Sequence, residues 1–541
     1  MEIFGRISEG RYLALTLAAL AVLLLFPAAI MLTQWSGLLL VLLFVAMALV
    51  AIGVHDLMQT RHAILRNYPI IGHMRFFFEK IRPEMRQYFF EADTDGRPFP
   101  REKRAIVYQR AKRELDKKPF GTQGDVYAEG HEWMLHSMAP APLAKGLFRT
   151  TIGGPQCKQP YSASILNISA LSYGALSANA IRALNKGAKE GGFAHDTGEG
   201  SVSPYHREFG GDLIWEIGSG YFGCRNTDGT FSDAMFAKLA IHPQIKMIEI
   251  KISQGAKPGH GGVLPAAKVT QEIAAIRGVA MGQDCISPAS HSAFSTPLEL
   301  MHFVGNLRDL SGGKPTGFKL CIGHPVEFMG VVKAMLESGT TPDFIVVDGK
   351  EGGTGAAPAE FIDNIGMPLR DGLAFVHSTL IGVGLRDKIK LGCAGKIITG
   401  FDMARAHALG ADWCNAARGF MFAVGCIQAQ TCHTGHCPTG VTTQDPSRQR
   451  AIVVPSKAER VANFHRETIK SLAEMLAAAG MTSPLDLKPH HISRRVGDGR
   501  ILTLADLHPV LLNGALLSGL APQAAQEMWT QASSGRFGES G

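Results

Sequence analysis

From about residue 160 onward, short runs rich in β-branched residues alternate with segments of helical period. The run "ASILNISA" precedes "SANAIRALNKGAKEGG", "KMIEIKIS" precedes "AAKVTQEIAAIRG", and "GFKLCIG" precedes "VEFMGVVKAMLESG". The runs "DFIVVDG", "IKLGCAG" and "DWCNAARG" are each followed by a further helical segment. Six strand-then-helix units predict a parallel α/β fold, and their number favours a closed (β/α)8 barrel of the TIM type over an open sheet.

Glycine-rich loops follow several of these strands, at the barrel end where function is expected. They read "DTGEGS" (196–201), "KISQGAKPGHGG" (251–262) and "VDGKEGGTGAAP" (347–358). Any one of them has a simpler explanation, because glycine also serves tight strand-to-helix turns. Three such loops at one face, two of them with lysines, favour a ligand site.

The pattern of glycines also narrows the choice of cofactor. No P-loop is present, and no G-x-G-x-x-G opens a strand–helix–strand unit, so ATP and NAD are disfavoured. A phosphate is expected at the loops after the last two strands, which read "GCAGK" (392–396) and "NAARG" (415–419). FMN meets these requirements, because it has a single phosphate and a flat ring whose reduced form lysines can neutralise.

Three cysteines lie at a C-x5-C-x4-C spacing in a loop of small residues, namely Cys426, Cys432 and Cys437. Three thiolates can hold an iron–sulfur cluster, or zinc if His433 or His436 supplies a fourth ligand, and the spacing alone leaves both open. The other cysteines are scattered and the total of nine is odd, so a reducing compartment is favoured over a disulfide scaffold.

Residues 12–32 and 37–54 are apolar and free of charge, and each stretch is long enough to cross a bilayer. Only four residues separate them, so we expect a membrane hairpin over 1–56, with a signal peptide as the competing interpretation. By the positive-inside rule, flanking arginines place both ends, and the catalytic domain, on the cytoplasmic side of the cytoplasmic membrane. These arginines are Arg6, Arg11, Arg61, Arg66 and Arg75.

The remaining chain divides by composition. Residues 57–150 are polar and arginine-rich, with a helix expected over 101–118, and are interpreted as a linker and helical outer layer without a site. The barrel with its cysteine loop is expected over 151–480 and a C-terminal tail over 481–541. The net charge of +7 is dispersed and aromatics make up only 8%, which argues against a nucleic-acid-binding protein.

The cysteine loop "GCIQAQTCHTGHCPTGVTTQ" (425–444), together with "TGEG", "KISQGAKPG" and "GGTGAAP", resembles the FMN-binding synthase domain of glutamate synthases. The resemblance covers about residues 150–480, with the motifs in the family's order. The hairpin and the flanking segments lie outside it and look like the compact membrane-bound members of this family.

The resemblance implies that Cys426, Cys432 and Cys437 bind a 3Fe-4S cluster, which passes electrons to FMN. The reduced flavin would deliver a hydride to 2-iminoglutarate, formed from 2-oxoglutarate and ammonia, to give glutamate. By motif, the FMN contacts are Ser172, Tyr173, Gly174, Ala175, Lys251, Gly352, Gly353, Thr354, Gly395, Ala417 and Arg418.

The catalytic residues implied by the resemblance are Lys251, Lys257, Arg277 and Glu199. Lys257 and Arg277 match positions at the acceptor, where two cations suit a dicarboxylate. Glu199 matches a carboxylate beside the flavin that orients the imine or moves its proton. Simpler readings exist, because Arg277 ends a helix, where a cation is favourable, and Glu199 lies in a turn.

Two departures from the family pattern bear on the substrate. The family loop "GAKPGEGGQLP" reads "GAKPGHGGVLP" here, so His260 replaces Glu, and Val263 replaces a Gln that helps to bind 2-oxoglutarate. The alternatives are therefore another amine or 2-oxo acid, or a non-catalytic membrane-tethered electron-transfer subunit. Without a glutamine-hydrolysing cysteine at the start or an NAD(P)H domain after 480, we expect ammonia and a separate electron donor: a ferredoxin, a reductase or a membrane carrier.

Overall fold

The computed structural model describes residues 10–144, 146 and 148–538. The chain divides into two compact units, residues 1–96 and 97–541. Each unit is described by itself below.

The first unit begins with two apolar helices, α2 (Leu13–Met31) and α3 (Ser36–Met58), preceded by the single turn η1 (Gly10–Tyr12) and joined by the short turn η2 (Thr33–Trp35). The segments Gly10–Met31 and Ser36–Met58, with mean hydropathies of 2.6 and 3.0, are long and apolar enough to cross a membrane by length and composition. The two helices pack closely, since a Cβ on Gly53 would lie 2.5 Å from Leu15 Cδ1. The expected spans 12–32 and 37–54 coincide largely with these helices, whereas Arg6 lies outside the described residues.

The rest of the first unit is helical and is tied to the end of α3. It comprises α4 (Ala63–Asn67), α5 (Gly72–Met85) and the π-helical turn η3 (Arg86–Phe90). The buried carboxylate of Asp56 accepts hydrogen bonds from the Ile70 backbone N–H, at 2.9 Å, and from His73 Nε2, at 2.9 Å. The first turn of α5 is therefore fixed beside the last turns of α3.

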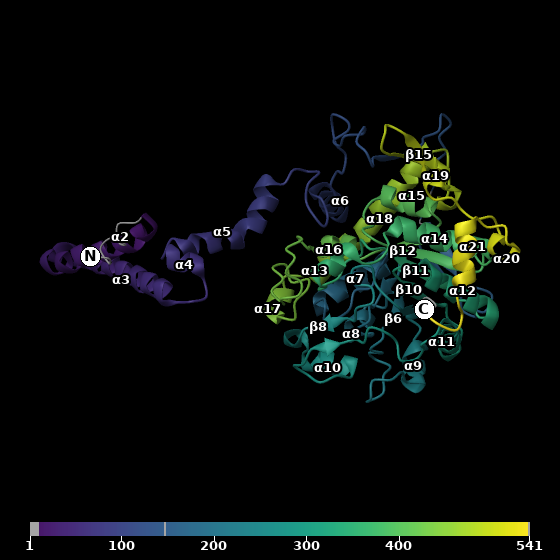
Figure 1. Ribbon diagram of the computed structural model, residues 1–541, viewed down its shortest axis with the longest axis horizontal. Helices are drawn as coiled ribbons and strands as arrows, with labels where there is room; N and C mark the ends of the chain where they lie inside the picture. Colours follow the sequence, from purple (N-terminus) through teal and green to yellow (C-terminus); the bar gives the residue numbers. More distant parts are fainter. Residues whose placement is uncertain (1–9, 145, 147, 539–541) are drawn as a thin grey trace. The chain divides into compact units, whose positions relative to one another are not determined.

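The second unit is built on eight parallel strands that close into a barrel, in the order β10-β11-β12-β13-β4-β5-β6-β7. Figure 1 shows β10, β11 and β12 next to one another, with helices around them. These strands are β4 (Leu166–Ile168), β5 (His195–Asp196), β6 (Leu213–Ile217), β7 (Ile245–Lys251), β10 (Thr316–Leu320), β11 (Phe344–Asp348), β12 (Lys390–Ala394) and β13 (Trp413–Ala416). The predicted TIM-type barrel is confirmed. The six predicted strands are all in it, and β5 and β6 complete it.

Helices alternate with these strands and cover the barrel. They are α7 (Ala178–Gly191), α8 (Pro204–Arg207), α9 (Asp233–Ala240), α10 (Gln271–Arg277), α11 (Pro297–Leu310), α12 (Pro325–Ser338), α13 (Ala359–Asn364), α14 (Leu369–Gly382), α15 (Gly400–Ala408), α16 (Arg418–Val424), α17 (Pro446–Gln449) and α18 (Val454–Ala478), with the short turn η4 (Ala266–Lys268). Inside the barrel, Phe344 and Trp413 belong to a small apolar core with Ile152 and Tyr161 of the β2 (Arg149–Ile152) and β3 (Tyr161–Ser164) hairpin. This hairpin precedes the first barrel strand, so it closes the end of the barrel opposite the glycine-rich loops.

The segment before the barrel includes α6 (Arg101–Lys112), which packs on the outside of the barrel. Its Lys103 Nζ lies 2.8 Å from Asp402, and the Ala111 carbonyl accepts a hydrogen bond from Asn463 at 3.2 Å. The expected helix over 101–118 is wrong at its end. Arg113 takes a left-handed conformation, with φ 60°, and its N–H turns back to the helix carbonyls, which ends α6.

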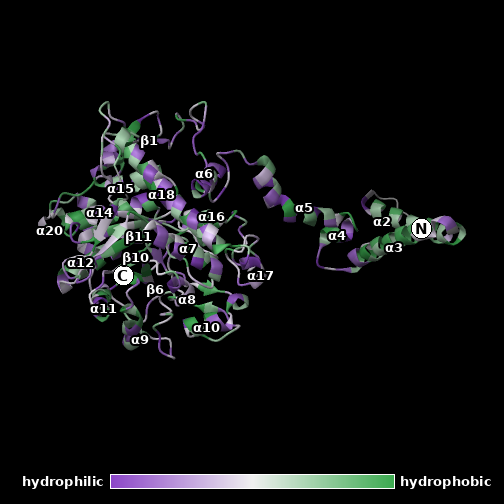
Figure 2. Ribbon diagram, turned by 180° about the vertical axis from the view of Figure 1, so that it is seen from behind, coloured by the Kyte–Doolittle hydropathy of each residue, from purple (hydrophilic) through white to green (hydrophobic). Residues whose placement is uncertain are grey.

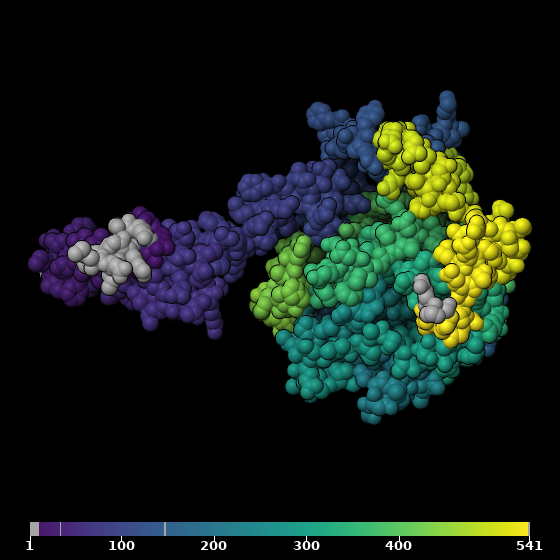
Figure 3. Space-filling model, viewed as in Figure 1, coloured from purple at the N-terminus to yellow at the C-terminus, as the bar shows by residue number. Residues whose placement is uncertain are grey.

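The C-terminal segment is folded onto the outside of the barrel (Figure 3). Its strands β14 (Ile492–Arg495) and β15 (Ile501–Thr503) form an antiparallel sheet with β1 (Glu132–Met134). The short helix α21 (Gln523–Gln531) packs against α12. The remaining elements are β8 (Val263–Leu264), β9 (Cys285–Ile286), η5 (Pro484–Asp486), η6 (Pro489–His491), α19 (Leu504–Leu507) and α20 (Ala515–Ser518).

Candidate active site

The loops after the barrel strands enclose a cavity of about 1010 Å³, open space at its mouth included. The predicted site residues that line it are Ser172, Ala175, Glu199, Lys251, Lys257, Arg277, Gly353, Thr354, Ala417, Arg418 and Cys432. A second cavity adjoins it, sharing Thr354, Arg418 and Cys432, and adds Gly352, Gly395 and Cys426. Residues that are far apart in the sequence therefore meet at the carboxyl ends of the strands, as parallel barrels require.

Three predicted site residues do not line either cavity. The Tyr173 side chain points away and donates a hydrogen bond to Glu272 Oε2 at 2.7 Å, while its carbonyl accepts one from Arg277 at 3.1 Å. Gly174 has a φ of +102° and lies behind the cavity wall, where a Cβ would be 3.2 Å from the Arg277 guanidinium. Cys437 is buried in the cysteine loop. These residues shape the wall rather than face the cavity.

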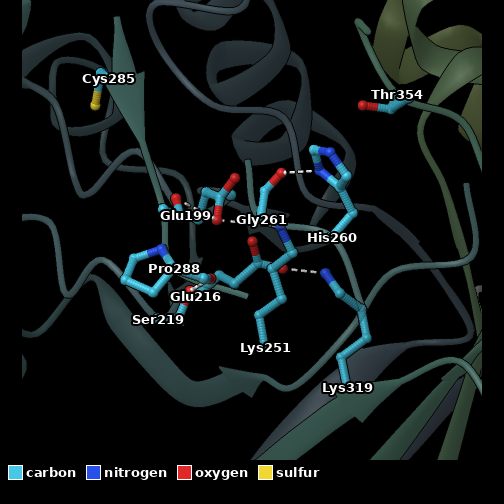
Figure 4. Close-up of polar contacts among 12 residues, drawn as sticks. Glu199, Glu216, Ser219, Lys251, His260, Gly261, Cys285, Pro288, Lys319 and Thr354 are labelled. Atoms are coloured by element: carbon cyan, nitrogen blue, oxygen red, sulfur yellow. Dashed lines mark hydrogen bonds and ion pairs between the residues drawn. The ribbon is translucent and has the colours of Figure 1, made fainter. Parts of the chain in front are cut away.

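Glu199 is held at the cavity by a cation and a hydroxyl (Figure 4). Its Oε2 lies 3.1 Å from Lys251 Nζ and accepts a hydrogen bond from Ser287 Oγ at 3.3 Å. Burial alone would raise the pKa of Glu199, but Lys251 and two further cations of the cavity more than offset it, so this pKa is lowered. The carboxylate is therefore ionised at neutral pH.

These two further cations, Lys257 and Arg277, are each only 4% exposed. Burial and the neighbouring Lys251 lower the pKa of Lys257. The Arg277 guanidinium lies 5.2 Å from the ring centre of Phe222 and ends α10, as its position in the sequence indicates. Five cations line the cavity against the two carboxylates Glu199 and Glu216, so the cavity carries an excess of positive charge that suits an anionic ligand. The cations are Lys251, Lys257, Lys268, Arg277 and Arg418.

Glu199 can take this position because Gly262 has no side chain. A Cβ on Gly262 would lie 2.0 Å from Glu199 Oε1. We expect Gly262→Ala to displace the carboxylate and to lower kcat/KM about 100-fold, the cost of a misplacement near 1 Å. Thermal unfolding should change little, because the Gly262 backbone is not left-handed.

The matched control for this substitution is Gly323→Ala. Nothing lies within 4 Å of a Cβ at Gly323, whose backbone is not left-handed either. Its kcat/KM should equal that of the parent protein. Equal kcat/KM in Gly262→Ala would show that the position of Glu199 does not matter for turnover.

The two residues that depart from the family pattern differ in whether they line the cavity. Val263 is 38% exposed and lines the cavity. His260 is exposed, with its Nδ1 2.8 Å from the Gly261 carbonyl oxygen and its ring against Phe361 (Figure 4). Of the two, only Val263 can change what the cavity binds directly.

A buried charge cluster inside the barrel has no counterpart in the sequence predictions. Lys319 of β10 pairs with Glu216 of β6 (Figure 4). Lys319 Nζ also lies 3.1 Å from Glu249 of β7 and 3.9 Å from Asp196 of β5. Burial raises the pKa of Glu249 to about 7 and also raises that of Asp196. Glu216 lines the first cavity and Lys319 the second, so the cluster forms part of the cavity floor.

The cysteine loop is held by residues from three other parts of the chain. The Tyr108 hydroxyl of α6 donates to the Cys426 carbonyl at 2.7 Å. Lys268 Nζ donates to the Cys432 carbonyl at 2.6 Å. The Arg418 guanidinium lies 3.9 Å from Cys432 Sγ. Sequence reasoning did not find Tyr108 or Lys268, and the region around α6 was interpreted as free of site residues.

The three thiols differ in exposure and acidity. Cys426 and Cys437 are buried, whereas Cys432 is half-buried and faces the cavities. Burial raises the pKa of Cys426. Burial would also raise the pKa of Cys437, but hydrogen bonds from Thr439 and Thr442 lower it to about 7. The loop is thus arranged to stabilise a thiolate at Cys437.

The barrel and its loops define an enzyme of the (β/α)8 class with a cationic cavity at the strands' carboxyl ends. Residues 155–482 match the family described as the conserved region in glutamate synthase. The chain belongs to the glutamate synthase family and is a glutamate synthase-like oxidoreductase.

The chain is similar to several known proteins. It is 38% identical to the glutamate synthase large subunit-like protein YerD of Bacillus subtilis, over 84% of this chain and 94% of that protein. It is 35% identical to the archaeal-type glutamate synthase [NADPH] of Thermotoga neapolitana, over 58% of this chain and 59% of that protein. Among solved structures, a double mutant of flavocytochrome b2 with pyruvate bound matches 77% of this chain and 85% of its own, with 13% identity and a TM-score of 0.39.

Proposed function

We propose that the protein is an FMN- and 3Fe-4S-dependent oxidoreductase that reduces 2-iminoglutarate, formed from 2-oxoglutarate and ammonia, to glutamate. One observation carries this proposal: Cys432 of the three-cysteine loop lines the same cavity as Glu199 and its cations. A redox centre on these thiols would therefore adjoin the place where an anionic substrate binds.

The walls of the two cavities fit FMN. Gly353 and Arg418 line both cavities, and a Cβ on Gly353 would lie 2.9 Å from Arg418 Nε, so the loop 347–358 can approach this arginine because it has no side chain there. Lys251 and Arg418 supply positive charge for a phosphate and for a reduced ring. The proposed FMN contacts are Ser172, Ala175, Lys251, Gly352, Gly353, Thr354, Gly395, Ala417 and Arg418, with Tyr173 and Gly174 contributing backbone behind them.

The cysteine loop fits an iron–sulfur cluster better than a zinc ion. Among the residues that the structure describes, Asp196, Glu216 and Glu249 are the only three or more His, Cys, Asp or Glu side chains with ligand atoms within 4.8 Å of one another. The thiols and His433 or His436 thus do not form the compact set that one zinc ion needs. An iron–sulfur cluster would be held by the thiolates of Cys426, Cys432 and Cys437, and the positive charges of Lys268 and Arg418 beside Cys432 would balance its negative charge.

In the proposed reaction, the side chains around the cavity then have defined roles. Bound FMN supplies the hydride and the cluster supplies single electrons. Lys257 and Arg277 bind the carboxylates of the acceptor, and their burial strengthens that attraction. Glu199, kept ionised by Lys251, orients the imine and exchanges its proton.

The test is anaerobic purification followed by a reoxidation experiment. Visible and electron paramagnetic resonance spectra should show a flavin and an iron–sulfur cluster. Adding 2-oxoglutarate with ammonium to the reduced protein should reoxidise the flavin and form glutamate. A reduced flavin that persists with every 2-oxo acid and amine would mean that the cofactors serve only electron transfer.

A second candidate keeps the cofactors and changes the acceptor. The observation that favours it is Val263, which presents an apolar surface to the cavity where the family pattern has an amide. A screen of 2-oxo acids with ammonium under anaerobic reduction separates the two candidates. Faster reoxidation by a less polar 2-oxo acid than by 2-oxoglutarate would establish this alternative.

Restoring the amide gives a further prediction. We expect Val263→Gln to lower the KM for 2-oxoglutarate about tenfold, the value of one hydrogen bond to a charged group. Initial rates over a range of 2-oxoglutarate concentrations measure it. Val263→Leu is the control, because it changes size without adding a donor, and an equal fall in its KM would contradict the explanation.

The proposal extends to localisation and partners. The two apolar helices would anchor the protein as a hairpin in the cytoplasmic membrane, with the catalytic unit in the cytoplasm. Ammonia would be taken up as such, and a ferredoxin, a reductase or a membrane carrier would supply electrons. Resistance of the protein to alkaline carbonate extraction, together with protease access from the cytoplasmic side alone, tests the anchoring.

A further inference from the structure

The helix α5 and the turn η3 present an unusually apolar face. At 100° per residue, one side of α5 gathers Met74, Phe77, Phe78, Ile81 and Met85, and Tyr88 follows in η3. Phe77, Phe78 and Tyr88 are 54%, 55% and 57% exposed, so this face lies uncovered. Large exposed aromatic side chains grouped in this way mark a binding surface rather than ordinary solvent contact.

A second side of α5, about 120° around the helix axis from the apolar face, is charged. Arg75, Glu79, Arg82 and Arg86 follow one another at helical spacing, and Arg75 lies 3.2 Å from Glu79. Arginine therefore dominates this side. Figure 2 shows the contrast, because α2 and α3 are coloured hydrophobic over most of their length whereas α5 carries both colours. A helix with a charged face cannot cross a bilayer as α2 and α3 can.

The position of α5 along the chain decides between the possible surfaces. Asp56 joins the last turns of α3 to Ile70 and His73, so α5 begins where the second apolar helix ends. At such a boundary, a helix can run into water or lie along the membrane surface. Its phenylalanines disfavour water, and its arginines match the headgroup phosphates of anionic lipids.

We propose that α5 and η3 lie in the cytoplasmic interface of the membrane, with the apolar face in the headgroup–acyl boundary and the arginines on anionic headgroups. The inference rests on the proposed membrane anchoring and adds a second, peripheral contact to it. The occupant is the lipid surface itself, because the apolar face continues directly from a proposed span.

The test uses the full-length protein in vesicles of phosphatidylcholine and phosphatidylglycerol, with and without lipids brominated near the headgroup. Phe77→Trp places an indole on the apolar face, and Glu79→Trp, two residues away, places one on the charged face. We expect brominated lipid to remove most of the fluorescence that Phe77→Trp adds and little of what Glu79→Trp adds. Equal quenching of the two variants, or none, would overturn the proposal.

Trp35, between α2 and α3, separates this result from the fate of the hairpin. The difference between the parent protein and Trp35→Phe reports whether the turn between the two helices reaches lipid. If Trp35 is quenched and the indole of Phe77→Trp is not, the interfacial position of α5 is rejected and the membrane anchoring by the hairpin still stands. If neither indole is quenched, the hairpin is not inserted and both proposals fail. Both tryptophans on α5 replace exposed side chains, and unchanged thermal unfolding verifies that the variants fold.

Discussion

Replacing Cys437 by serine should abolish the iron–sulfur signal while leaving the flavin in place. Serine oxygen is a harder and far less acidic ligand than a thiolate, so two thiols would remain for three irons. Because Cys437 lines neither cavity, the FMN walls stay intact. Electron paramagnetic resonance and flavin absorbance of the anaerobically purified variant measure the two cofactors separately.

The Cys437→Ser variant tests separately the two steps of the proposed electron path, from the donor to the flavin and from the flavin to the substrate. Reduction of the flavin by reduced ferredoxin should fall to the background rate, whereas flavin reduced directly by dithionite should still be reoxidised by substrate. Cys157→Ser is the control, because that half-buried thiol donates a hydrogen bond to the Gly313 carbonyl at 3.4 Å and lines neither cavity. A normal cluster signal in Cys437→Ser would remove this residue from the ligand set.

The barrel could be predicted from the sequence wherever a strand is a long apolar run. The strands β5 and β6 lack the pattern of a strand followed directly by a long helical segment. His195–Asp196 is only two residues long, both are polar, and the next helix has four residues, whereas Leu213–Ile217 is followed by a long loop before α9 begins at Asp233. Both strands are fully buried, and their polar side chains contribute to the charge cluster around Lys319. Tertiary burial of charge overrode the pattern on which strand prediction depends.

The site was predictable where its residues share a loop with glycines or cysteines. Lys251, Lys257 and Glu199 belong to such loops and meet at one cavity. Lys268 and Tyr108 could not be found in this way, since each acts through hydrogen bonds to carbonyls that are distant in the sequence. Contacts of this kind depend on which helices pack against the loop, and a single sequence carries no local signal for them.

Replacing Glu199 by glutamine should lower kcat by about 10² to 10⁴-fold, the range for loss of a positioned acid or base. Glutamine keeps the shape and can still accept a hydrogen bond from Ser287, but it cannot exchange a proton with the imine. The KM for the 2-oxo acid should change little, because Lys257 and Arg277 remain. Stopped-flow reoxidation of the reduced flavin measures the chemical step directly.

The pH dependence of turnover tests the role of the Glu199 carboxylate, because the direction in which its acid limb moves can be predicted for each variant. The lowered pKa of Glu199 means that the carboxylate stays ionised until the pH falls well below neutral, so protonation of Glu199 should reduce the activity of the parent protein on the acid side. Lys251→Met removes the largest attraction that holds this pKa down, while burial remains, so the profile is read as the position of its acid limb relative to the variant's own maximum. The acid limb should therefore move to higher pH in Lys251→Met and be absent from Glu199→Gln. An acid limb that stays at the same pH in both variants would assign the titration to a group other than Glu199.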